Sequence, residues 1–279
     1  MIRDILKKLN IDSYAFVPAA ALGTANERLR ASLPADENVI FMLIPYYRGD
    51  CGGMISAYGA VFDYHAYAAK LTELVCDYIR RELGEVAVGF CDHSPFAECE
   101  GAALAGLGVI GDNSLLITEK YSSYVFICEV FTSLSADALA EEGIPAGDMK
   151  IKYCEGCGAC KKACPAEIAD KSGRDLCISS LTQKKGALTE NEEALIVKGG
   201  SIWGCDRCQA VCPHTKKALK AGTLCSSIPY FADSHIQGDP ADVILAMDDD
   251  TFARYPFAWR KRATITRNIE LLKKERNKR

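Results

Sequence analysis

The chain has 279 residues, of which 49% are hydrophobic and 25% charged, with a formal net charge of −4. This composition excludes disordered and fibrous proteins and indicates one large globular domain or two smaller ones. No apolar run reaches the roughly 18–20 residues that span a bilayer, and the N-terminus lacks a signal-peptide core, so we expect a cytoplasmic protein. Its 14 cysteines therefore indicate metal sites in place of disulfides.

Strands and helices alternate in the first part of the chain. Apolar and β-rich segments predict strands over 40–47, 86–90, 115–118 and 124–132. Helical spacing of apolar residues predicts a helix over 63–83, which Gly84 ends. A second helix is expected to begin at Ser94 and Pro95, because proline is favoured at the first helical position. This alternation is typical of an α/β or α+β domain, expected over 1–145.

Eight cysteines form two blocks with a single cysteine between them. The first block, C-x2-C-x2-C-x3-C followed by proline, has the spacing of bacterial ferredoxins, in which three thiolates bind one cluster and the fourth binds another. The second block, C-x2-C-x3-C-P, lacks its first cysteine, for which Cys177 is the natural replacement. The expected ligands of two [4Fe–4S] clusters are Cys154, Cys157, Cys160 and Cys212 for one, and Cys164, Cys177, Cys205 and Cys208 for the other. We expect a ferredoxin-like domain over 146–232.

A pair of zinc knuckles is the alternative, since C-x2-C units also suit tetrahedral zinc. Zinc has no use for the third close cysteine or the C-P endings, whereas the crossed arrangement uses all eight thiolates. The remaining cysteines have no ligand spacing and are expected to be small buried hydrophobic residues: Cys51, Cys76, Cys91, Cys99, Cys128 and Cys225. Two adjacent clusters form an electron relay, which implies an electron acceptor in the N-terminal domain.

The glycine pattern G-x-G-x-x-G at Gly106, Gly108 and Gly111 carries a weak signal for dinucleotide binding. That fingerprint needs a strand before the glycines and a helix after them. Here the expected order is the reverse, so we do not expect NAD at this loop.

Three polar residues lie at expected helix starts. Asp92 follows a strand, where an aspartate is usually a turn or cap residue and alternatively a proton donor at the strand end. Asp63 and His65 are ordinary for a helix start. They also open the D-x-H pattern of corrinoid-binding proteins, but Ala68 stands at its glycine position and the match fails.

The C-terminal extension over 233–279 ends in a basic tail. Residues 259–279 hold nine Lys and Arg against two Glu, a local charge of +7. Such a tail is typical either of a polyanion-binding segment or of a terminal helix with a solvated basic face.

Several stretches, in order along the chain, resemble the epoxyqueuosine reductase family. Besides the two cysteine blocks they are DYH (63–65), DHSPFAE (92–98), GLGVIGDNSLLI (106–117), YVFICEVFTSL (124–134), LCISSLT (176–182) and RKRATITRN (260–268). The double-cluster region is shared more widely, for example with reductive dehalogenases. The D-x-x-P-x-x-E, GLG-x-x-G and CIS-x-LT stretches are the more specific parts.

The resemblance implies a cobalamin-dependent reductase that converts epoxyqueuosine to queuosine in the tRNA wobble position. It implies a domain that holds base-off cobalamin, clusters that pass electrons from an external donor, and Asp92 as the group that supplies a proton, with a pKa raised by burial. The tRNA would be held in part by the basic tail over 260–279. Residues implied to bind cobalamin are Asp63, His65, Gly108, Gly111 and Ser179.

The chain departs from the family at two charged positions. Cys99 stands where the family usually has Lys or Arg, and Asp112 stands where it usually has Lys. Longer members also continue into helical repeats that help to hold tRNA. A reductase with the same cofactors acting on a small epoxide or organohalide therefore stays an alternative, as does a two-cluster electron carrier.

Overall fold

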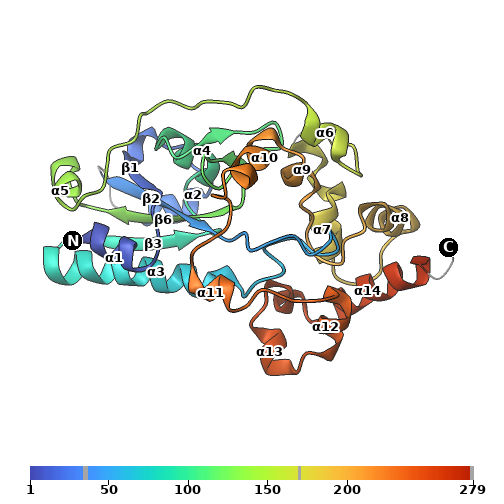
Figure 1. Ribbon diagram of the computed structural model, residues 1–279. Helices are drawn as coiled ribbons and strands as arrows, with labels where there is room; N and C mark the ends of the chain where they lie inside the picture. Colours follow the sequence, from blue (N-terminus) through green and yellow to red (C-terminus); the bar gives the residue numbers. More distant parts are fainter. Residues whose placement is uncertain (34–36, 169–170, 277–279) are drawn as a thin grey trace.

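The computed structural model describes residues 1–33, 37–168 and 171–276, and Figure 1 shows a sheet with flanking helices at one end and most helices of the C-terminal half at the other. The strands are β1 (Tyr14–Pro18), β2 (Asn38–Pro45), β3 (Ala87–Cys91), β4 (Val109–Ile110), β5 (Leu116–Ile117) and β6 (Val125–Thr132). The helices are α1 (Ile2–Lys8), α2 (Glu27–Ala31), α3 (Tyr64–Tyr78), α4 (Glu98–Leu104), α5 (Ala136–Glu141), α6 (Ala159–Ala163), α7 (Ile178–Gln183), α8 (Glu190–Gly199), α9 (Arg207–Ala210), α10 (Pro213–Lys220), α11 (Pro229–Ala232), α12 (Pro240–Ala246), α13 (Asp249–Ala253) and α14 (Arg262–Arg276). None of the described helices is long and apolar enough to cross a membrane.

The main sheet has four strands in the order β1-β2-β6-β3, and every neighbouring pair is antiparallel. The alternation of elements left α/β and α+β open, and this pairing decides for α+β. The short strands β4 and β5 form a separate antiparallel pair. The mixed helix and sheet content predicted from the sequence is confirmed.

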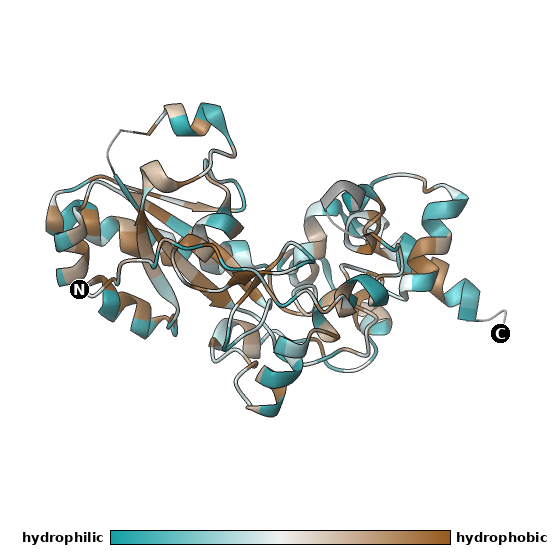
Figure 2. Ribbon diagram, turned by 90° about the horizontal axis from the view of Figure 1, so that it is seen from above, coloured by the Kyte–Doolittle hydropathy of each residue, from teal (hydrophilic) through white to brown (hydrophobic). Residues whose placement is uncertain are grey.

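Strand β2 is buried on both faces, because helices cover both sides of the sheet. Ile40, Met42 and Ile44 pack with α1, α3 and residues of α11, whereas the intervening residues pack with α4 on the opposite face. This period of two is the expected geometry of a strand. Figure 2 shows hydrophobic residues gathered in the strands and hydrophilic residues on the outer helices.

Helix α3 begins and ends as the sequence predicts. The Asp63 side chain accepts a hydrogen bond from the backbone N–H of His65 at the N-terminus. A π-helical turn over Ile79–Leu83 leads to Gly84, whose φ of 73° is left-handed, so a glycine ends the helix without strain.

Helix α4 begins at Glu98, so the expected start at Ser94 and Pro95 is wrong. The Pro95 carbonyl accepts hydrogen bonds from the backbone of Ala25 and Asn26, which hold this stretch against a neighbouring loop. Tertiary contacts thus override the local preference of proline for the first helical turn.

A third hydrophobic core joins the cluster region, which is the stretch 154–212 that holds the eight expected ligand cysteines, to the C-terminal helices α12, α13 and α14. Two segments that are far apart in the sequence connect this core to the sheet. The loop between β2 and α3 packs on Trp203, and a Cβ on Gly59 would lie 2.8 Å from the Trp203 ring. In return, Leu224, Ile228 and Phe231 belong to the core beneath the sheet. The segment before the cysteines thus packs into the third core, and the segment after them packs into the core of the sheet. Together they hold the cluster region against the sheet.

The cysteines outside the two blocks do not form one buried class. Cys76 and Cys128 are buried as expected, and three others are half-buried: Cys51, Cys91 and Cys99. Cys225 is exposed, so the expectation of burial is wrong there. It lies in the connection between α10 and α11.

Candidate cluster and cofactor site

The eight cysteines line two neighbouring hollows, in the division that the crossed assignment predicts. Cys154, Cys157, Cys160 and Cys212 line the smaller hollow. Cys164, Cys177, Cys205 and Cys208 line a larger cavity, which Cys160 also borders. Cys164 and Cys212 thus each lie with the other block. No three described His, Cys, Asp or Glu side chains converge as ligands of a single metal ion.

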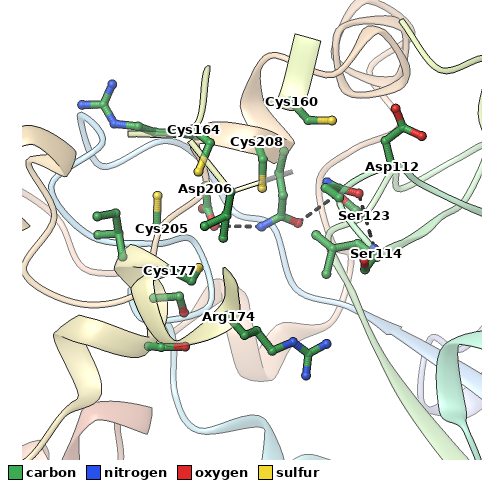
Figure 3. A pocket seen from close by; sticks show the side chains of 18 of the residues that line it. Asp112, Ser114, Ser123, Cys160, Cys164, Arg174, Cys177, Cys205, Asp206 and Cys208 are labelled. Atoms are coloured by element: carbon green, nitrogen blue, oxygen red, sulfur yellow. Dashed lines mark hydrogen bonds between the residues drawn. The ribbon is translucent and has the colours of Figure 1, made fainter. Parts of the chain in front are cut away.

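The larger cavity has a volume of about 480 Å³ and lies between the cluster region and one edge of the sheet. Figure 3 shows Cys164, Cys177, Cys205 and Cys208 on the same side of it, with Cys160 nearer to Asp112. The opposite wall includes Val125 and Phe126 at the start of β6, and Ser179 of α7 also lines the cavity. Its lining mixes aromatic and aliphatic surface with hydroxyl and amide groups, as ligand cavities commonly do.

A buried hydrogen-bond network holds the cluster loop against the sheet region. The carboxylate of Asp206 accepts hydrogen bonds from the backbone of Ala57 at 2.6 Å and from the side-chain amide of Gln209 at 2.9 Å. Gln209 in turn accepts a hydrogen bond from the hydroxyl of Ser123. Because Asp206 and Gln209 belong to the cysteine-bearing loop and α9, whereas Ala57 and Ser123 lie in distant parts of the chain, the network positions the cluster cysteines relative to the cavity wall.

Two of the cavity thiols need a cation to ionise. Burial raises the pKa of Cys205 to about 11 and that of Cys208 to about 12. A thiolate at such a site is stable only when it binds a metal. This donor set therefore fits an iron–sulfur cluster.

At the same edge of the sheet, Asp63, Tyr64, His65 and Asp92 form one polar group. The Tyr64 hydroxyl donates a hydrogen bond to Asp92 Oδ2, and His65 Nε2 lies 3.3 Å from the same oxygen. The other ring nitrogen of His65 lies 2.7 Å from Asp63 Oδ1. The Tyr64 ring stacks on Phe126 with 3.6 Å between centroids, and this contact connects the group to the cavity wall.

Asp92 has the properties that a proton donor needs. Its φ of 62° places it in the left-handed region, which aspartate tolerates better than most residues. Burial, and then the charge of Asp63, raise the pKa of its carboxyl. The side chain is 51% exposed, so solvent moderates this rise. Asp92, Asp63 and His65 lie together, although none of them lines the cavity itself.

Two further carboxyl groups lie behind Asp92, and the sequence reasoning missed both. Glu98 is half-buried at the start of α4, and burial followed by the charge of Asp92 raises its pKa to about 7. Glu129 of β6 is fully buried, and burial raises its pKa to about 8. Glu98 stands in the quoted DHSPFAE stretch, and Glu129 is a charge inside an apolar strand. Each of these two features of the sequence could have indicated a functional carboxyl group.

Gly108 and Gly111 contact β5 and lie outside the lining of the larger cavity. A Cβ on Gly108 would lie 2.6 Å from the carbonyl oxygen of Ile117, and one on Gly111 would lie 2.7 Å from the Ile117 side chain. The glycines therefore permit close packing of the pair β4–β5. The helix before them and the strand after them confirm the order that argued against a dinucleotide loop.

Gly108→Ala is expected to lower the free energy of unfolding by about 1–3 kcal/mol, since the added methyl group would be forced against backbone. Urea denaturation under anaerobic conditions measures it. Gly23→Ala is the matched control, because its nearest neighbour is 3.7 Å away and a change within about 0.5 kcal/mol is expected. Unchanged stability with weakened corrinoid binding would instead assign Gly108 to the cofactor.

The two departures from the family have different surroundings. Asp112 lines both hollows and forms an ion pair of 3.3 Å with Lys161, which follows Cys160 in α6. The positive charge near this loop is thus supplied from the cluster region. Cys99 lies half-buried in the first turn of α4.

Comparison with known proteins shows which proteins resemble this chain. Residues 153–215 match the family described as a 4Fe-4S double cluster binding domain. An epoxyqueuosine reductase of Pseudomonas aeruginosa is 32% identical over 218 residues, which are 73% of this chain and 58% of the relative. One of Leadbetterella byssophila is 35% identical over 198 residues, which are 67% of this chain and 61% of the relative. The chain thus spans about three fifths of the length of these curated relatives.

A solved structure shares the fold. An epoxyqueuosine reductase crystallised with an epoxyqueuosine-modified tRNA stem loop superposes with a TM-score of 0.74 at 22% identity. The match covers 97% of this chain and 79% of the solved chain.

Proposed function

We propose that this relative of the epoxyqueuosine reductases is a cobalamin- and iron–sulfur-dependent reductase that converts epoxyqueuosine to queuosine in tRNA. One observation carries the proposal. The double-cluster cysteines border a cavity whose opposite wall is the sheet edge beside Asp92. A relay, a cavity for the reacting groups and a proton donor thus follow one another in space.

The lining of the larger cavity fits a corrinoid. Tyr46, Tyr58 and Phe126 offer flat apolar surface, and Ser179 and Ser180 offer hydroxyl groups that can bond to amide side chains. When bound there, cobalamin would supply the reduced cobalt centre that opens the epoxide. The neighbouring thiolates of Cys164, Cys177, Cys205 and Cys208 would hold the cluster that delivers electrons to it.

The chain's own side chains supply and orient the proton. Asp92 protonates the oxygen that leaves carbon, because an alkoxide is a poor leaving group without a proton. The Tyr64 hydroxyl and His65 fix the direction of the Asp92 carboxyl. Asp63 fixes the ring of His65 in turn.

The basic tail supports a tRNA partner, although part of its charge is used inside the protein. Arg262 bonds to backbone carbonyls of 244–248 and pairs with Asp249, and Arg267 donates to carbonyls of Lys184 and Gly186. The side chains left for a polyanion on the exposed surface include Lys261, Lys274 and Arg276.

Replacing Lys261, Lys274 and Arg276 together by alanine is expected to weaken binding of an anticodon stem loop about tenfold and to flatten its salt dependence, because fewer counterions are released. Fluorescence anisotropy at several salt concentrations measures this. Lys7, Lys8 and Arg81, exposed at the other end of the molecule, form the matched control triple. Equal losses in both triples would remove the tail from the tRNA interface.

Anaerobic reconstitution with iron, sulfide and cobalamin tests the proposed function directly. About eight irons per chain, a base-off cob(II)alamin signal by electron paramagnetic resonance, and queuosine in digested tRNA are expected. Reduction of a small epoxide or organohalide but not of tRNA would favour the alternative substrate class. A pure preparation with both clusters that never takes up corrinoid would leave an electron carrier.

A further inference from the structure

Epoxide reduction needs more protons than Asp92 can hold. Conversion of an epoxide to an alkene breaks two C–O bonds, forms a C=C bond and releases water, so it consumes two electrons and two protons. The clusters and the external donor supply the electrons in the proposed function. One carboxyl group carries one proton, and therefore the second must reach the same place during turnover.

We propose that Glu98 returns a proton to Asp92 within each catalytic cycle, with Glu129 as the buried group behind it. This inference rests on the proposed function. The Glu98 carboxylic acid would give its proton to the Asp92 carboxylate. Glu98, left as the carboxylate, would then regain a proton from Glu129 or from solvent.

The sheet register supports this order of groups, because Asp92 directly follows Cys91, whose partner Cys128 directly precedes Glu129 in β6. The backbone N–H of Asp92 lies close enough to the Glu98 carboxyl to lower the pKa of Glu98. Glu98 in turn acts on the pKa of Glu129. The three carboxyl groups therefore form a series from the half-exposed Asp92 to the interior of β6.

Unpartnered oxygens indicate that the inner carboxyl groups are held as acids. Glu98 Oε1 and Glu129 Oε1 are both buried with no hydrogen-bond partner in the described part of the chain. The other oxygen of Glu129 accepts a hydrogen bond from Ser94, whose own position in the loop is set by the bond that it accepts from Phe96 N. Burying a carboxylate without partners costs far more free energy than burying the neutral acid.

Among the described residues, Tyr64, His65 and Ser94 bond to or pair with members of the series, and the other groups that act on the pKa values of its members are acids. Asp63 raises the pKa of Asp92. Cys91 lies opposite Cys128 in the strand pair β3–β6, and its thiol donates a hydrogen bond to the carbonyl of Ile127. Asp92 and Glu98 both raise the pKa of Cys128. His65 is the competing proton source, since its ring is 56% exposed and its hydrogen bond to Asp63 raises its pKa.

Glu98→Gln tests the relay, because glutamine keeps the size and an acceptor for the Asp92 N–H but carries no transferable proton. In the reconstituted protein we expect kcat to fall about 10–100-fold, with iron content, cobalamin content and KM for tRNA unchanged. In the wild type kcat should fall as pH rises through about 7, where Glu98 loses its proton, and Glu98→Gln should abolish this limb. Glu100→Gln, on the exposed side of the same helix, should match the wild type.

A readout without turnover accompanies the kinetics. Difference infrared spectra of the cluster-loaded protein, with carbon-13 in glutamate, should show protonated carboxyl groups that titrate near 7 and 8. Glu98→Gln should remove the lower titration and Glu129→Gln the higher.

Three results would overturn the relay. The first is a wild-type kcat and pH profile in Glu98→Gln, which would leave the second proton to His65 or solvent. The second is the absence of the infrared signals of protonated carboxyl groups. The third is an equal loss of kcat in Glu98→Gln and Glu100→Gln. A wild-type protein that holds both cofactors but does not convert the tRNA would overturn the proposed function instead.

Discussion

Asp92→Asn is expected to lower kcat for epoxyqueuosine reduction by at least about 10²-fold while iron content, corrinoid uptake and tRNA affinity stay unchanged. Asparagine keeps the shape and the contacts with Tyr64 and His65 but has no acidic proton for the leaving oxygen. Single-turnover assays under anaerobic conditions, with queuosine quantified by mass spectrometry, measure the effect.

The pH dependence follows from the sign of the shift. Burial raises the pKa of Asp92, so the protonated form that donates is present at low pH and is lost as pH rises through that raised pKa. Wild-type kcat should therefore fall with rising pH. Asp137→Asn, exposed on α5, is the control and should behave as the wild type. Full turnover in Asp92→Asn would remove this residue from the reaction.

The second large effect concerns the crossing of the cluster ligands, and double variants expose it. Cys157→Ser with Cys212→Ser alters two ligands that line the same hollow, so we expect the loss of one cluster and about four irons. Cys157→Ser with Cys164→Ser alters ligands of different hollows, so we expect both clusters to be lost. Iron and sulfide analysis after anaerobic reconstitution measures each variant.

An uncrossed arrangement would reverse these two results, because Cys157 and Cys164 would then share a cluster. The exposed Cys225 provides the control, and Cys225→Ser should keep about eight irons. Circular dichroism of each variant separates cluster loss from unfolding. Both double variants are expected to lose all activity, since the loss of either cluster interrupts electron transfer along the relay.

The cluster ligands could be predicted because their chemistry is local. A ferredoxin loop wraps its metal within a few residues, so the spacing of the two blocks indicates seven of the expected thiolates, and Cys177 was added as the replacement for the missing one. The strands over 38–45 and 125–132 could also be predicted, because both are largely apolar runs of strand length. Helix α3 was bounded by its own end residues, Asp63 and Gly84.

The proposed proton-donor group could not be assembled from sequence spacing. Tyr64 and Asp92 are 28 residues apart, and Glu129 lies on a strand that pairs with the one before Asp92. Their proximity depends on β6 lying between β2 and β3 in an antiparallel sheet. The start of α4 was mispredicted for a similar reason, since contacts from Ala25 and Asn26 hold Pro95 outside the helix.

The sequence by itself therefore indicated the class of cofactor and predicted the eight thiolate ligands, and its resemblance to a family pointed to the residue proposed as acid. Only the tertiary structure decided the antiparallel strand pairing and which residues surround Asp92. It also decided the position of the cavity, which is lined by Cys164, Cys177, Cys205 and Cys208. The physical reason is range. Thiolate spacing and strand propensity act over a few residues, whereas burial and electrostatic coupling arise between segments that are neighbours only in the folded chain.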